Sequence, residues 1–188
     1  MQEEILEFWF GRPGTADYGS TRRAWFGKDA AFDAATAYRF GAAIETALSG
    51  GFTDWAAPRG MLARILLLDQ FTRNSFRDTP RAFAGDALAL ALAGEATARG
   101  DDRDLIPVER WFMYMPYVHA ESPSAQERGV SLFRRLRDET GLVEPLPWAE
   151  RHAEIIRRFG RFPHRNAILG RESTLEEFAF LAPPGSRF

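Results

Sequence analysis

The side chains best suited to chemistry in this sequence are its three histidines, His119, His152 and His164. An imidazole can act as a general acid or base near neutral pH. The chain has no cysteine and no serine in a nucleophile-elbow motif, so no nucleophile stands out. Hydrolysis by an activated water, or an isomerase-type proton transfer, are the reactions that such residues allow, and whether the protein is an enzyme stays open.

A group of polar residues continues an apolar helix. Residues 61–68 are apolar almost all round, which predicts a deeply placed helix. Asp69 and Arg73 extend the leucine row of positions 62 and 66, and their i,i+4 spacing allows an ion pair. Gln70 and Asn74 follow them along the chain. The pair either fixes helix register as an internal ion pair or forms one wall of a polar pocket.

A similar pattern surrounds Arg110, which shares a helical stripe with Tyr114. An arginine among large apolar groups needs a carboxylate, an anion or an aromatic face. Beyond Pro116, His119 and Glu121 are close enough in sequence to share a site. The alternative for His119 is a core histidine that is hydrogen-bonded to the backbone.

His152 lies on one helical stripe with Trp148, Ile156 and Phe159, and Arg151 precedes it. A lone histidine on such a face is commonly a satisfied core residue, which is the alternative to a functional role.

The segment that follows is the most suggestive loop, with Arg161, His164, Arg165 and Asn166 close together. Pro163 can start a short helix whose free N–H groups attract anions. The alternative is a connecting loop whose side chains cap neighbouring helices.

Helices must position these residues, because strand patterns are scarce. Asp29 and Asp86 are predicted N-caps, and Ser124 and Thr174, each three residues before a glutamate, predict capping boxes. Helices are predicted over residues 5–11, 29–50, 59–74, 86–100, 107–116, 124–141, 147–160 and from 174 onward. The sequence therefore predicts one all-α domain over residues 1–188, an array of antiparallel helix pairs.

Composition narrows the classes of function. The 188 residues carry a formal net charge of −2, which argues against a dedicated nucleic-acid binder. No apolar run is long enough for a membrane span, and the acidic N-terminus does not resemble a signal peptide. We expect a soluble, cytoplasmic protein with no nucleic-acid partner and no membrane.

Several stretches resemble a known family. They are ILEFWFG at 5–11, LLDQFTRN at 67–74, RAFA at 81–84, YMP at 114–116 followed by His119 and Glu121, and RFPHRN at 161–166. On these stretches the chain resembles the bacterial domain-of-unknown-function 924 family over nearly its whole length, with Thr72 where the family has proline. The resemblance implies an all-helical, tetratricopeptide-like fold and supplies no activity.

We expect these residues to form a site for a small carboxylate or phosphate, with His119, His152 or His164 as candidate catalytic groups. The predicted ligand-binding residues are Asp69, Gln70, Arg73, Asn74, Arg110, Tyr114, Glu121, Arg151, Arg161, Arg165 and Asn166.

Two other hypotheses carry less weight. A helical module could bind a peptide segment of a protein partner in a groove. The aromatics Trp9, Phe10, Trp25 and Phe26 could contribute to it, but core packing is the favoured interpretation of these residues. A metal site built from His119, Glu121, His152 and His164 is not expected, since the chain has no compact ligand spacing. No cofactor is indicated.

Overall fold

Helices form the regular structure of residues 1–183, the part of the chain that the computed structural model describes. No strand occurs within that range, so the all-α prediction is confirmed. The α-helices are α1 (Gln2–Phe10), α2 (Ala30–Leu48), α3 (Pro58–Ile65), α4 (Thr72–Ser75), α5 (Asp86–Arg99), α6 (Pro107–His119), α7 (Pro123–Thr140), α8 (Pro145–Phe159) and α9 (Leu175–Leu181). A π-helical segment, Leu66–Phe71, joins α3 to α4.

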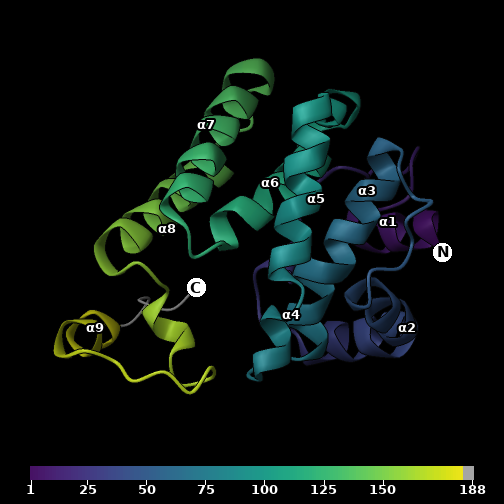
Figure 1. Ribbon diagram of the computed structural model, residues 1–188. Coiled ribbons are helices and arrows are strands. Elements are labelled where there is room, and N and C mark those ends of the chain that lie inside the picture. Colours follow the sequence, from purple (N-terminus) through teal and green to yellow (C-terminus); the bar gives the residue numbers. More distant parts are fainter. Residues whose placement is uncertain (184–188) are drawn as a thin grey trace.

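The helices form two groups that meet at α5 and α6 (Figure 1). In the first group, α2 packs on α4 and on the π-helical segment, and α1 packs on α3. In the second, α6, α7 and α8 pack on one another in chain order. This succession is compatible with an array of helix pairs, and its likeness to tetratricopeptide arrays stays a prediction.

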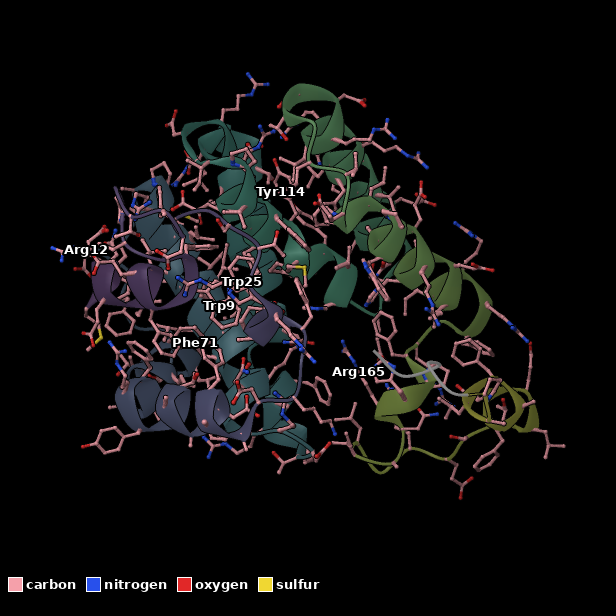
Figure 2. The ribbon with its side chains drawn as sticks, turned by 180° about the vertical axis from the view of Figure 1, so that it is seen from behind. Trp9, Arg12, Trp25, Phe71, Tyr114 and Arg165 are labelled. Atoms are coloured by element: carbon pink, nitrogen blue, oxygen red, sulfur yellow. The ribbon has the colours of Figure 1, made fainter. Side chains whose placement is uncertain are left out.

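Aromatic side chains fill the core of the first group. Trp9 is fully buried, with its ring centroid 6.0 Å from that of Trp25 and 5.4 Å from that of Phe71. Figure 2 shows the three side chains close together inside the N-terminal helices. Phe10 is also fully buried, whereas Phe26 is exposed. Three of the four aromatics considered for a peptide groove are therefore core residues.

Of the four predicted helix caps, two are present in the structure and two are not. Asp29 accepts hydrogen bonds from the first backbone N–H groups of α2, and Thr174 forms the predicted capping box of α9. The box predicted at Ser124 is wrong, because Ser122 is the N-cap of α7. Pro123 has no N–H to satisfy and therefore suits the first helical position.

Two further differences change where polar residues lie. Gly85, not Asp86, is the N-cap of α5. The sequence predicts that the helix from Pro107 ends at Pro116, but α6 continues through this proline to His119. Packing of α6 against α5 and α7 outweighs the hydrogen bond lost at the proline. His119 therefore occupies the last turn of α6.

Candidate functional site

The π-helical segment carries two polar side chains into the interior. Asp69 is 0% exposed and Gln70 is buried beside it. Turns of this type widen the helix and are frequent at functional sites. Carbonyl groups of the wide turn are satisfied by side chains: Thr72 Oγ1 donates to the Leu68 carbonyl at 2.8 Å, and Arg73 Nη1 donates to the Asp69 carbonyl at 2.6 Å.

The Asp69 carboxylate has three side-chain partners. His119 Nδ1 lies 2.7 Å from Oδ1, Arg73 Nη1 lies 3.1 Å from the same oxygen, and Gln70 Nε2 donates to Oδ2 at 2.6 Å. Burial alone would raise the pKa of Asp69, but the charge of Arg73 and the contact with His119 hold that pKa below its usual range. The carboxylate is therefore ionised, and the predicted Asp69–Arg73 pair is present.

His119 is held in one orientation by this carboxylate. Burial and the neighbouring Arg73 charge lower the pKa of its imidazole, although Asp69 opposes the shift. A neutral ring next to an ionised carboxylate donates from Nδ1, so the lone pair lies on Nε2. No hydrogen bond from the described residues engages Nε2, and 12% of the side chain is exposed. This arrangement suits a group that exchanges protons.

Asp86 links two arginines at the start of α5. Arg73 Nη2 lies 2.9 Å from Asp86 Oδ1, and Arg165 Nη1 donates to Oδ2 at 3.2 Å. Arg165 Nη2 also donates to the His119 carbonyl at 3.0 Å. We call Asp69, Arg73, Asp86, His119 and Arg165 the Asp69–His119 cluster.

Arg165 is only 6% exposed. Its guanidinium carbon lies 4.6 Å from the ring centroids of both Phe83 and Phe162, contacts that stabilise a desolvated cation. Burial and the charge of Arg73 lower the pKa of Arg165 to about 10. Its Nε is buried and has no hydrogen-bond acceptor among the described residues. Figure 2 shows Arg165 between the C-terminal segment and the N-terminal helices.

The other two histidines gather near His119 and Arg165. The ring centroids of His119 and His152 are 6.3 Å apart, and those of His164 and Phe162 are 5.6 Å apart. Burial, followed by the effect of His119, lowers the pKa of His152 to about 3. Burial, followed by the charge of Arg165, lowers the pKa of His164 to about 4. Both rings are therefore neutral at neutral pH.

A groove of about 460 Å³ lies beside His164, between the loop after α8 and helix α9. Asp78, Ile168 and Phe178 are among the residues that line it. Among residues 1–183, the lining of the groove includes no arginine. Of the three histidines, His164 is the one that lines the groove.

Three more predicted residues hold the C-terminal segment against the cluster. Glu121 accepts from the Phe162 backbone N–H at 2.7 Å and from Arg171 at 2.6 and 2.9 Å. Arg161 pairs with Glu177 at 2.7 and 2.8 Å, and Asn166 donates to the same carboxylate at 3.3 Å. These contacts position the neighbouring Arg165.

Arg110 and Tyr114 lie elsewhere. Arg110 is nine residues before His119 on α6, or about 13 Å along the axis. It donates to Glu139 at 2.6 Å and to the Tyr114 hydroxyl at 3.3 Å. Tyr114 donates to the buried Asp102, and Figure 2 shows it well apart from Arg165. These residues form a separate network.

Two other predicted residues contact side chains outside the cluster. Asn74 donates to Asp33 of α2 at 2.6 Å. Arg151 is exposed on α8, with its guanidinium carbon 5.9 Å from the Trp148 ring centroid.

Sequence reasoning missed the roles of Asp86, Arg171 and Phe83. The sequence predicts a helix cap at Asp86, and nothing in its spacing indicates that it binds two arginines. Phe83 lies in the RAFA stretch, one of the stretches that carry the family resemblance, and this is the sequence feature that could have pointed to it. Arg171 gives no signal.

Residues 1–183 contain neither a cluster of candidate metal ligands nor a helix suited to crossing a membrane. That range contains no group of three or more His, Cys, Asp or Glu side chains that could hold a metal ion. None of its helices is both long and apolar enough to cross a membrane.

Comparisons with known proteins identify one family and one related solved structure. The family model described as a bacterial protein of unknown function (DUF924) matches residues 5–185. The solved structure of the protein of unknown function ATU0120 from Agrobacterium tumefaciens is 41% identical, with 96% of each chain covered and a TM-score of 0.84. None of the curated proteins matches the chain.

Proposed function

The chain belongs to the DUF924 family, as its motifs predicted, and we propose that it binds a small molecule at the Asp69–His119 cluster through a carboxylate or phosphate group. The observation that carries this proposal is the buried Arg165 Nε, which has no acceptor among the described residues, close to His119, whose carbonyl accepts from the same arginine. An anionic oxygen would accept from Arg165 and contact the His119 ring.

An internal ion-pair network is the simpler alternative. It accounts for Asp69, Arg73 and Asp86, each of which lies within 3.1 Å of an oppositely charged group. It does not account for Arg165 Nε, because leaving a buried donor unsatisfied costs about 1–3 kcal/mol. A guanidinium has five N–H donors, and only two nitrogens of Arg165 have acceptors among the described residues. A ligand oxygen would remove this cost, which supports a binding role.

His119 is the residue that we propose to exchange a proton with the ligand. Its Nδ1 is fixed by Asp69 at 2.7 Å, the arrangement by which a carboxylate sets the tautomer of a catalytic histidine. His152 and His164 remain secondary candidates. Burial, followed by the effect of His119, disfavours a proton on His152, and burial, followed by the charge of Arg165, disfavours a proton on His164. The reaction class would be proton transfer or activation of a water.

Peptide binding is a second candidate with one observation in its favour. Leu175 and Phe178 lie three residues apart on α9 and are 89% and 61% exposed. Side chains with this spacing share one helix face, which an apolar segment of a protein partner could cover.

A ligand screen tests the proposed anion site. Melting temperatures of wild type, Arg165→Gln and Arg110→Gln would be measured with a panel of small carboxylates and phosphates. Arg110 is the matched control, because it is as buried as Arg165 but lies in the other network. A ligand at one hundred times its Kd stabilises the folded state by about 2.7 kcal/mol.

We expect one chemical class of ligand to raise the melting temperature of wild type and Arg110→Gln but not of Arg165→Gln. No shift with any anion, or equal shifts in all three proteins, would contradict an anion site at Arg165. An apolar peptide that stabilises wild type, but not a Phe178→Ser variant, would favour the second candidate.

A further inference from the structure

The fixed charges of the Asp69–His119 cluster cancel. Its two carboxylates, Asp69 and Asp86, face its two guanidinium groups, Arg73 and Arg165, and each carboxylate lies within 3.2 Å of at least one of them. No fixed positive charge is therefore left over to balance an incoming anion. A bound anion would leave an uncompensated negative charge in a largely buried place, which is unfavourable.

Among residues 1–183, the groups around the cluster leave this balance unchanged. Glu121, after α6, pairs with Arg171, which follows the 3₁₀ turn Pro163–Arg165. His152 on α8 and His164 in the turn are neutral rings. His119 is the cluster member that can gain a positive charge by taking up a proton, and its Nε2 is the nitrogen that receives it.

We propose that this cluster binds its anionic ligand together with one proton, which is taken up by His119. This inference rests on the proposed function, because it concerns the same site and the same class of ligand. In the complex, Asp69 accepts from Nδ1–H of the imidazolium, and Nε2–H donates to the carboxylate or phosphate oxygen. The cluster is then charge-balanced with its ligand in place.

Two consequences follow from the linkage between proton and ligand. An anion within hydrogen-bond distance favours the charged imidazole and raises its pKa. The affinity then falls by up to about tenfold for each unit of pH increase between the His119 pKa of the free form and the higher pKa of the bound form, since one proton is taken up with each ligand in that range. His119 in the complex is a proton donor, so a bound substrate would meet a general acid.

Isothermal titration calorimetry with sulfate and with acetate tests the inference. Neither probe titrates between pH 6 and 8, so any proton taken up comes to the protein. The binding enthalpy at one pH would be measured in buffers that differ in ionisation enthalpy, and the Kd would be followed from pH 6 to 8. We expect wild type to take up a proton and to bind more weakly as the pH rises.

His119→Gln and Arg110→Gln provide the comparison. We expect His119→Gln to bind with no proton uptake and with a Kd independent of pH, and Arg110→Gln, whose guanidinium pairs with Glu139 in the separate network, to behave as wild type. If His119→Gln does not fold, NMR titration of the His119 ring in wild type, with and without sulfate, replaces it. The His119 pKa should then rise in the presence of sulfate.

The outcomes separate the two proposals. Anion binding by wild type without proton uptake overturns the coupling and leaves the anion site intact. Uptake that persists in His119→Gln, or a His119 pKa that sulfate does not move, overturns the assignment to His119. If wild type binds neither sulfate nor acetate, and no member of the wider panel of carboxylates and phosphates either, the proposed function itself fails.

Discussion

Gly85 lies directly against the backbone of Leu68. A Cβ atom at residue 85 would lie 2.8 Å from the carbonyl carbon and 2.9 Å from the Cα of Leu68. Only glycine allows the start of α5 to approach the π-helical segment so closely. Because Asp86 follows Gly85, this approach is what brings the Asp86 carboxylate to Arg73.

Gly85→Ala is expected to destabilise the protein by about 1–3 kcal/mol, the usual cost of forcing extra volume into a packed site. The neighbour is backbone and cannot rotate away, so α5 must shift. Gly94→Ala in the middle of α5 is the matched control, because its Cβ would meet only the Tyr117 hydroxyl at 3.9 Å. Alanine there should stabilise the helix by up to about 1 kcal/mol.

Urea unfolding of the two variants provides the check. The variants must differ in the sign of their effect on the free energy of unfolding. A Gly85→Ala protein as stable as wild type would show that the close approach does not set the position of α5.

The charges beside His119 should control its pKa in opposite directions. Arg73 lowers that pKa and Asp69 raises it, on top of the lowering caused by burial. Arg73→Gln should therefore raise the pKa of His119, and Asp69→Asn should lower it further. NMR titration of the three histidine rings would measure both shifts. Movement of both variants in the same direction would show that a structural change, not charge, dominates.

Much of this cluster follows from sequence periodicity. The leucine row at positions 62 and 66 places Asp69 in the interior, and its i,i+4 relation to Arg73 predicts a pair that the structure has at 3.1 Å. The acidic cap at Asp29 and the box at Thr174 were also predictable, because each depends only on neighbouring residues.

The rest depends on contacts between distant segments. Asp86 looks like a helix cap in sequence, but two arginines compete with the backbone for its carboxylate, and they arrive from residues 73 and 165. The spacing of apolar residues does not predict the π-helical segment. Pro116 predicts a helix end from local sterics alone, whereas tertiary packing carries α6 on to His119 and so places the ring beside Asp69.

Acid should destabilise the protein before its carboxylates are protonated. The pKa values of His152 and His164, about 3 and about 4, lie below the unfolded value of about 6.5. Above about pH 6.5 both rings are neutral in the folded and the unfolded state, and the folded state has its full stability. As the pH falls toward 4 and then 3, the unfolded state binds protons that the folded state does not, and the free energy of unfolding decreases. At pH 5 each of these histidines should lower the free energy of unfolding by on the order of 1–2 kcal/mol.

Urea unfolding between pH 8 and pH 5 measures how the free energy of unfolding depends on pH. His152→Gln and His164→Gln should each reduce this dependence, because glutamine does not titrate. Glu177 cannot be its source, since hydrogen bonds from Arg161 hold the pKa of that carboxyl at about 2, and an ionised Glu177 loses its contribution only as the pH falls from about 4.5 to 2. A stability that stays flat to pH 5 in wild type would mean that the two rings are protonated without penalty.

The separate network on α6 should act on stability and not on ligand binding. The Tyr114 hydroxyl donates to the fully buried Asp102 and accepts from Arg135 at 3.2 Å. Tyr114→Phe takes a donor from a buried carboxylate, and hydrogen bonds to charged groups are worth about 1.5–3 kcal/mol. We expect a loss of stability in that range by urea unfolding.

Tyr117→Phe is the matched comparison, because its hydroxyl contacts the neutral Thr97 hydroxyl at 2.8 Å. Thr97 also bonds the Ala93 carbonyl at 2.8 Å, so its hydroxyl keeps a partner. The expected cost is about 0.5–1.5 kcal/mol, as for a neutral hydrogen bond. Equal costs would show that Asp102 does not depend on Tyr114.

A Tyr114→Phe protein that folds but no longer binds sulfate would mean that the two networks are coupled, and that Arg110 and Tyr114 belong to the ligand site after all.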